Sequence, residues 1–230
     1  MSISLPGFDT WLTDRLEECA GDSGEPVDTY VARAVASQMV TDCERVDRAS
    51  AGRLKAHLSL TGLSGEATAD GLSSVLADPT RLRALNATGL TDTSPDPTYA
   101  RLTRTTADAL SVPAAALVLI AVDRQFVISA AGSIPPADQT GLTESFDKYV
   151  VANGSLVSVD DARQHPLFKK YAAVARGQVV AYLGMPVADD GGNTVGALSV
   201  SDTAARRWTS GQMQILGDLA AVAAAQIFGT

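Results

Sequence analysis

Two apolar runs on either side of a glycine-containing turn constrain the fold of this chain more than any other feature. Residues 179–187 and 194–200 are largely apolar, and the segment between them reads ADDGGN. Gly191 and Gly192 adopt positive φ at little steric cost, so they allow a tight chain reversal. This pattern predicts a β-hairpin. Pro186 has no N–H to donate, so we expect it at a sheet edge or strand end.

A helix is predicted directly after this hairpin. Thr209 is followed three residues later by Gln212, which is the spacing of a capping box, and the apolar residues that follow are spaced as in a helix to about Phe228. Upstream, the same kind of pattern predicts helices at 99–110 and 140–152, strands at 114–122 and 125–131 joined at Asp123-Arg124, and a short strand at 156–159.

The first 60 residues predict a small, mainly helical module. Residues 2–5 alternate serine with apolar side chains, as in a half-buried strand, and two segments with helical spacing follow, separated by a glycine break at 21–24. Residues 61–71 are small and polar, which is typical of a linker. We therefore divide the chain into a module at 1–60, a linker at 61–77 and a larger domain at 78–230.

Charge and composition disfavour several classes of function. The 230-residue chain has a net charge of −8, which disfavours broad binding to nucleic acids or anionic membranes. Its apolar runs fall short of the ~20 residues that span a bilayer, and its amino terminus lacks a signal-like pattern, so we expect a cytoplasmic protein without membrane contact. The two cysteines and two histidines show no metal-ligand spacing, and no catalytic motif is present; we expect neither a metal site nor catalytic residues.

The larger domain resembles the GAF family. The resemblance rests on a strand ending GMPV, the glycine turn, TVGALSVSDT, and the helix TSGQMQILGDLAAVAAAQI, with SFDKYVVANGSLVSVDDARQHPLF upstream. It covers about residues 78–230 and implies an α+β fold: an antiparallel sheet with helices, including the first and last of the domain, against one face.

The resemblance also implies a small-molecule pocket between the sheet and the middle segment. Transferred by motif, the lining residues are Ser145, Phe146, Asp160, Phe168, Tyr171, Tyr182 and Met185. The alternative is that the aromatic residues simply fill the core. Some family members attach chromophores or reduce sulfoxides through cysteines, whereas residues 78–230 contain no cysteine and Asp147 follows Ser145-Phe146. We expect neither activity, and the sequence leaves any cofactor or ligand unidentified.

Residues 1–40 resemble a ribbon-helix-helix module, a family in which paired strands from two chains enter the DNA major groove. The resemblance places Ser2 and Ser4 on the DNA-facing side of the strand. Residues 1–60, however, carry six basic and ten acidic side chains, a balance of −4 that disfavours DNA. A module that only dimerises the chain is the alternative.

Together these features predict a non-enzymatic bacterial sensory or regulatory protein, a homodimer whose GAF domain binds a small molecule or partner and modulates the amino-terminal module. Two alternatives remain at this point. One is a DNA-binding transcription regulator of the ribbon-helix-helix type, and the other is a ligand-free GAF dimerisation scaffold.

Overall fold

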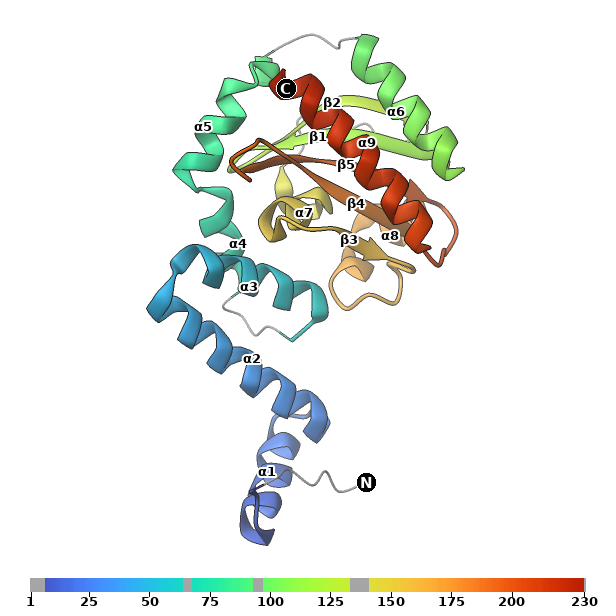
Figure 1. Ribbon diagram of the computed structural model, residues 1–230. Helices are drawn as coiled ribbons and strands as arrows, with labels where there is room; N and C mark the ends of the chain where they lie inside the picture. The colour runs from blue at the N-terminus through green and yellow to red at the C-terminus, as the bar shows by residue number, and fades with distance from the viewer. Residues whose placement is uncertain (1–6, 64–67, 93–96, 133–140, 230) are drawn as a thin grey trace.

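The computed structural model describes residues 7–63, 68–92, 97–132 and 141–229, and within them the fold is α+β, as predicted (Figure 1). Five strands in these residues form one antiparallel sheet in the order β2-β1-β5-β4-β3. The strands are β1 (Ala114–Ile120), β2 (Gln125–Gly132), β3 (Val157–Val159), β4 (Ala181–Ala188) and β5 (Thr194–Asp202).

Helices cover both faces and one end of this sheet. The α-helices are α1 (Thr10–Asp22), α2 (Val27–Val46), α3 (Arg48–Thr61), α4 (Thr68–Leu76), α5 (Pro79–Ala87), α6 (Pro97–Leu110), α7 (Asp147–Asn153), α8 (Ala172–Ala175) and α9 (Ser210–Phe228). Short 3₁₀ helices are η1 (Leu90–Asp92), η2 (Leu142–Glu144) and η3 (Phe168–Lys170). Within the described residues, no helix is both long and apolar enough to cross a bilayer.

The predicted hairpin is β4–β5, and its register is continuous from Ala181, opposite Asp202, to Val187, opposite Gly196. Its turn is fixed by the Asn193 backbone N–H, which donates to Asp189 Oδ1 at 2.8 Å, and by Gly192 at φ +77°. Among the described residues, β3 pairs with residues 182–184 of β4, so Pro186 lies beyond the end of β3 on an open stretch of the β4 edge, as its missing N–H requires.

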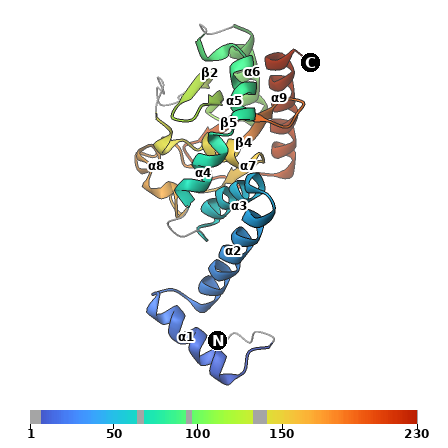
Figure 2. The same cartoon turned by 90° about the vertical axis from the view of Figure 1, so that its left-hand side faces the viewer.

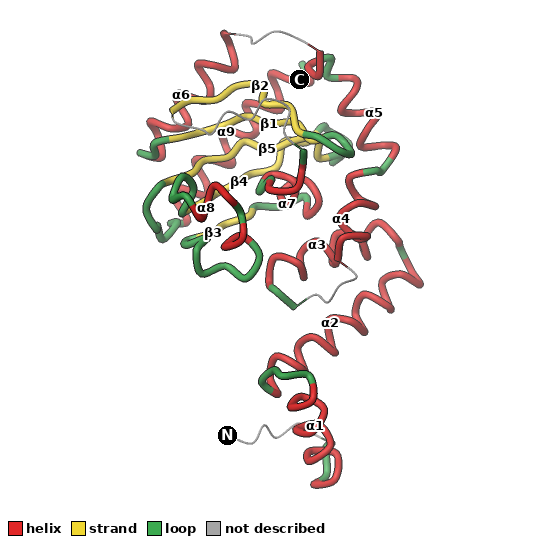
Figure 3. Tube along the Cα trace, turned by 180° about the vertical axis from the view of Figure 1, so that it is seen from behind, coloured by secondary structure: helices red, strands yellow, loops and turns green. Residues whose placement is uncertain are grey.

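The two faces of the sheet carry different helices. α6 and α9 pack together over one face, where α9 covers β4 and β5 and α6 covers β1 and β2 (Figure 1). The predicted capping box opens α9: the Thr209 side chain accepts from the Gln212 N–H at 3.2 Å, and the Gln212 side chain accepts from Thr209 N. α7 lies on the opposite face, seen in Figure 3 in front of the sheet.

Two local predictions need adjustment. Ile120 pairs with Gln125 and Ala121 N donates to Arg124 O at 2.8 Å, so the β1–β2 reversal is centred on Val122-Asp123, one residue before the predicted position. The helix predicted at 140–152 is divided, because η2 ends at Glu144 and the α-helix begins only at Asp147. Periodicity does not detect this division, because Phe146, which lies within it, is buried like Tyr149 and Val150 of α7 and has helical spacing to both.

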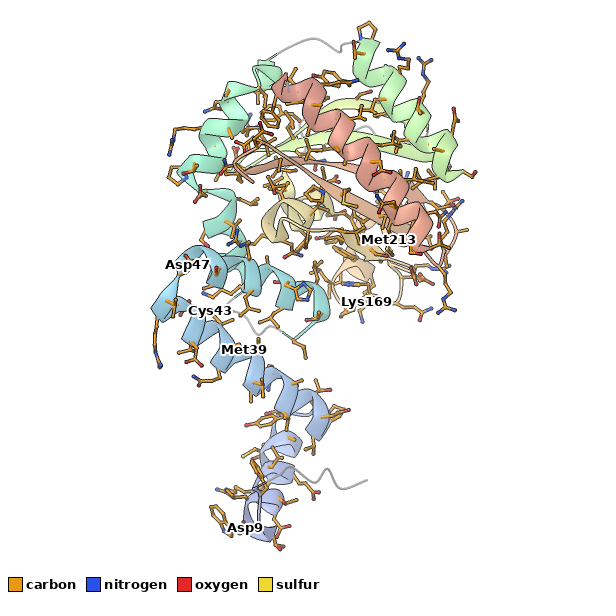
Figure 4. All side chains as sticks on the ribbon, in the orientation of Figure 1. Asp9, Met39, Cys43, Asp47, Lys169 and Met213 are labelled. Carbon is orange, nitrogen blue, oxygen red and sulfur yellow. The ribbon has the colours of Figure 1, made fainter. Side chains whose placement is uncertain are left out.

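An arm formed by α1 and α2 projects from the body of the protein (Figures 1 and 2). The predicted helix, glycine break and second helix are present, whereas the predicted strand at 2–5, with Ser2 and Ser4, lies outside the described residues. Trp11 is 69% exposed and Met39, on α2 in Figure 4, is 48% exposed. The arm thus carries large apolar side chains that its own two helices do not cover.

The helix α3 connects the arm to the body. It packs against α4 and against α7 of the larger domain. Ala51, Ala56 and Leu58 of α3 are buried, and residues 68–76 of the predicted linker form α4. Where the chain divides into independent folding units therefore stays a prediction that truncation must test.

Candidate functional site: a cavity between the sheet and α7

A cavity of about 240 Å³ lies between the α7 face of the sheet and the segment that leads into α7. Strands β1, β2, β4 and β5 supply its floor, and η2, the start of α7 and α8 supply the opposite wall. Its described lining comprises Ala115, Ala116, Val118, Gln125, Val127, Gly141, Glu144, Ser145, Phe146, Asp147, Ala173, Val179, Tyr182, Ser199, Val200 and Ser201.

Asp147 is the chemically most distinctive residue of this lining. Its carboxyl lies deep inside the protein, yet the residue keeps accessible surface because it faces the cavity. Tyr182 Oη donates to Asp147 Oδ1 at 2.7 Å, and the Ser199 hydroxyl also lies within hydrogen-bonding reach. Burial raises the pKa of the Asp147 carboxyl, while the hydrogen bonds from Tyr182 and Ser199 lower it in part.

Gly184 lets Tyr182 reach Asp147. Gly184 and Tyr182 are two apart on β4, so they share the face of the sheet toward α7. A Cβ at Gly184 would lie 2.3 Å from Tyr182 Oη and 2.7 Å from a methyl carbon of Val150, distances that real Cβ atoms do not show. The missing side chain therefore makes the space in which the Tyr182 ring lies.

An aromatic cluster supports the wall formed by Phe146. The Phe146 ring stacks on Tyr182 with centroids 4.9 Å apart and contacts Phe168 at 4.3 Å and Tyr171 at 5.3 Å. Burial raises the pKa of the Tyr182 hydroxyl, and the neighbouring Asp147 carboxyl raises it further. Tyr182 is thus a neutral hydrogen-bond donor at physiological pH.

Of the residues transferred from the family resemblance, Ser145, Phe146 and Tyr182 line the cavity. The Ser145 hydroxyl accepts from Lys148 N at 3.3 Å, so it also orders the first turn of α7. Phe168 is fully buried behind Phe146, and Tyr171 contacts the edge of the same cluster. These last two form a second layer, because Phe146 stands between them and Tyr182.

Asp160 and Met185 lie away from the cavity lining. Asp160 holds the segment before α9: its backbone O accepts from Arg206 N at 3.0 Å and its Oδ1 accepts from Trp208 N at 3.4 Å. Met185 faces α9, and its Cε is the nearest atom, at 3.3 Å, to a Cβ built on Gly217. Since the β4 register is continuous, Tyr182 and Met185 point to opposite faces of the sheet.

Sequence reasoning missed Asp147, Glu144 and Ser199 as lining residues. The sequence around Asp147 carries no signal that its carboxyl is buried, because the burial of the next five residues follows only from the packing of α7 on the sheet. The alternation of side chains along a strand predicts the position of Ser199, because Ser199 pairs with Gly184 across the hairpin and so lies on the same face of the sheet as Tyr182. Glu144 gives no such signal, since its position depends on η2; there its Oε2 accepts from Ala172 N at 2.7 Å.

The described lining carries acidic groups and no basic side chain. The nearest lysine along the chain, Lys148, is held outside it: its Nζ donates to the backbone oxygens of Leu142 at 2.6 Å and Thr143 at 3.0 Å. Desolvation by burial lowers the pKa of Lys148 to about 8. Lys148 thereby fixes η2, and the cavity keeps an acidic character.

A second, larger cleft of about 970 Å³ lies between α3, α4, the start of α5 and the β4–β5 turn. Its charged groups have local roles. Lys55 pairs with Glu44, and Asp78 caps α5 by accepting from the backbone N–H groups of Thr80 and Arg81. Arg81 is buried and donates to the Ile120 backbone O at 2.7 Å. The last of these bonds joins α5 to β1 of the sheet, whereas the other two act within the helices that precede the sheet.

Comparisons with known proteins match this architecture. The family model described as GAF domain matches residues 94–227. A type II free methionine-R-sulfoxide reductase from Thermoplasma acidophilum superposes with a TM-score of 0.50 at 11% identity, over 57% of this chain and 91% of that one. No curated protein matches the sequence.

Two further solved structures align over most of their own length. The GAF domain of an Acinetobacter phosphoenolpyruvate-protein phosphotransferase gives a TM-score of 0.49 at 17% identity, over 66% of this chain and 95% of that one. A Neisseria meningitidis free methionine-R-sulfoxide reductase in complex with its substrate gives a TM-score of 0.48 at 16% identity, over 79% of this chain and 91% of that one. The family match begins at residue 94, so it gives no support to the ribbon-helix-helix resemblance of residues 1–40.

Proposed function

Because the chain belongs to the GAF domain family, we propose that it is a non-enzymatic sensory protein that binds a small molecule in the cavity between its sheet and α7. The observation that carries the proposal is the cavity itself. It places a deep carboxyl, a tyrosine hydroxyl and two serines, Ser199 and Ser201, around apolar walls. A largely apolar cavity with a few convergent polar groups is the usual form of a small-molecule site.

The absence of cysteine from residues 78–230 argues against thiol chemistry at this site. The described residues that line the cavity also include no histidine. We therefore expect binding without turnover, and the relation to sulfoxide reductases is one of fold alone.

The arm is the element through which we expect binding to be communicated. Phe8, Trp11, Leu12, Val35, Met39 and Val46 are between 38% and 89% exposed. If each side chain exposes on the order of 100 Å², the six together offer about 600 Å² of apolar surface. This area is close to the roughly 800 Å² that each partner contributes to a stable interface. A second copy of this chain is the partner that fits best, because two copies present the same exposed apolar side chains and can bury them symmetrically.

Communication has a physical route in this fold. α3 follows α2 directly and packs on α7, and α7 begins with the cavity residue Asp147. A ligand that shifts α7 against the sheet would therefore move α3 and the base of the arm.

The binding proposal is tested on protein purified without added ligand. We expect heat or acid denaturation to release a stoichiometric small molecule detectable by mass spectrometry, or a crystal structure to show density in the cavity. A cavity closed by side chains in that structure would leave only a dimerisation scaffold.

The dimer proposal is tested by light scattering at micromolar concentration. Met39→Asp should shift the mass toward one chain, because it places a charge among the exposed apolar side chains of the arm. The control is Ser37→Asp, which adds the same charge at an exposed position on another side of α2 and should leave the mass unchanged. A monomer mass for the unmodified chain contradicts the proposal.

A further inference from the structure

We infer that the cavity selects a small organic cation, such as an amine or amidine, whose charged group binds Asp147 while its apolar part contacts Val118, Val127 and Phe146. This inference rests on the proposed function, since it names the ligand class of the same site. The location, charge and size of the cavity carry it.

The acidic side chains of the cavity lining determine which charge a ligand can carry. A carboxylate held away from bulk water is costly unless an opposite charge or hydrogen bonds compensate it. Tyr182 and Ser199 supply hydrogen bonds to Asp147, and the described lining supplies no basic side chain. A cation in the cavity would provide the compensating charge. A phosphate or carboxylate would instead meet Asp147 and Glu144 with like charge, which a binding site avoids.

Geometry supports a directed contact. Asp147 Oδ1 already accepts from Tyr182 at 2.7 Å, and this bond fixes the carboxyl on the α7 side of the cavity. A carboxylate has two oxygens with about four lone-pair positions, so further acceptor positions remain for a ligand. A planar amidinium can donate two parallel N–H bonds to such a group, which is a strong and specific pairing.

Size and wall chemistry limit the rest of the ligand. A volume of about 240 Å³ holds roughly eight water-sized units, so the ligand has on the order of ten non-hydrogen atoms. Val118 and Val127 lie on neighbouring strands, opposite one another in the β1–β2 register, and offer a flat apolar floor. The aromatic ring of Phe146 in the lining adds a surface that attracts cations.

The test uses three probes of nearly equal size and shape: benzamidine, benzamide and benzoate, which are cationic, neutral and anionic at pH 7.5. Each is titrated into the full-length protein by isothermal calorimetry, after dialysis against denaturant and refolding to remove any compound carried through purification. We expect benzamidine to bind at least ten-fold more tightly than benzamide, and benzoate to give no saturable binding.

The variant Asp147→Asn keeps the shape of the side chain and removes its charge. We expect it to weaken benzamidine at least ten-fold while the weak affinity for benzamide changes less than three-fold. Asp190→Asn is the matched control, because it removes one carboxylate from an exposed position in the β4–β5 turn and should change neither affinity. Circular dichroism and thermal unfolding verify that both variants fold.

The outcomes separate this inference from the proposed function. Benzamide or benzoate binding as tightly as benzamidine, or full benzamidine affinity in Asp147→Asn, overturns the cation selectivity and leaves a small-molecule site intact. So does a neutral or anionic compound recovered from the cavity of the purified protein. Failure of benzamidine to bind at about 10 mM also overturns it. The proposed function itself falls only when the cavity is closed in the crystal and no compound is recovered.

Discussion

Replacing Gly184 by alanine adds one methyl group at the point where the Tyr182 ring lies over the β4 backbone. The new Cβ would lie 2.3 Å from Tyr182 Oη, 2.9 Å from its Cζ and 2.7 Å from a Val150 methyl. The ring must therefore move, and this movement breaks the hydrogen bond from the Tyr182 hydroxyl to Asp147. Both the stability of the domain and the polar end of the cavity depend on that bond.

The magnitude follows from two contributions. Overpacking by one methyl costs about 1–3 kcal/mol, and the loss of a hydrogen bond to a charged group costs about 1.5–3 kcal/mol. Gly184→Ala should thus lower the free energy of unfolding by roughly 2–6 kcal/mol, or Tm by about 5–20 °C for a domain of this size. Denaturant unfolding followed by circular dichroism measures the loss.

A double-mutant cycle identifies the cause. Tyr182→Phe removes the hydroxyl that the new methyl group meets most closely, so Gly184→Ala should cost less in that background than in the unmodified protein. Gly217→Ala is the control on the opposite face of the sheet: its Cβ meets only the flexible end of Met185 at 3.3 Å, and alanine favours the helix by up to about 1 kcal/mol. A Gly184→Ala protein whose Tm lies within about 2 °C of the unmodified one would show that Tyr182 does not need this space.

Three further predictions concern packing, ionisation and domain limits. Phe168→Ala should lower the free energy of unfolding by ~3–5 kcal/mol while ligand affinity changes less than three-fold, because Phe168 fills the core behind the cavity wall. A larger loss of affinity than of stability would contradict this role. Burial lowers the pKa of Lys148 from 10.5 to about 8, so the cost of burying its charge is full below pH 8 and fades as the pH rises to about 10.5. Guanidinium unfolding should therefore show the stability of the unmodified protein rising relative to that of Lys148→Met between these two pH values. Parallel pH profiles for the two proteins would contradict this prediction. Removal of residues 1–46 should leave thermal unfolding cooperative. Removal of residues 1–62 should destabilise the domain, because it removes α3 and uncovers the surface of α7 on which α3 packs. Equal Tm values for the two truncated proteins would instead support the linker at 61–77 predicted from the sequence.

The parts of the fold that the sequence predicts are those with local chemical signals. Glycines mark the β4–β5 turn, the Thr209 and Gln212 pair marks the start of α9, and the missing N–H of Pro186 places it at an open edge. Each of these signals depends on a few neighbouring residues and on backbone hydrogen bonding. Their physical meaning therefore holds without knowledge of the tertiary structure.

The cavity depends on contacts between distant segments, and sequence reasoning finds it only in part. Phe146 and Tyr182 come together because α7 crosses the sheet, and strand parity then separates Tyr182 from Met185. Aromatic residues that line a cavity and those that fill a core have the same apolar spacing, so Phe168 could not be assigned to either set from the sequence. For Asp147 the family resemblance indicates only that a cysteine is missing there, and the burial of its carboxyl becomes visible once α7 is placed on the sheet.

A crystal structure of the full-length protein with benzamidine is the decisive test of the cavity and of its preference for cations. We expect density for the probe between Val127 and Phe146, with its two nitrogens about 2.7–2.9 Å from the Asp147 carboxylate and the Tyr182 hydroxyl still donating to Oδ1. Density for the probe elsewhere on the protein would contradict the preference for cations. A packed interior that closes Asp147 off, with no compound recovered from the purified protein, would contradict both proposals for this site.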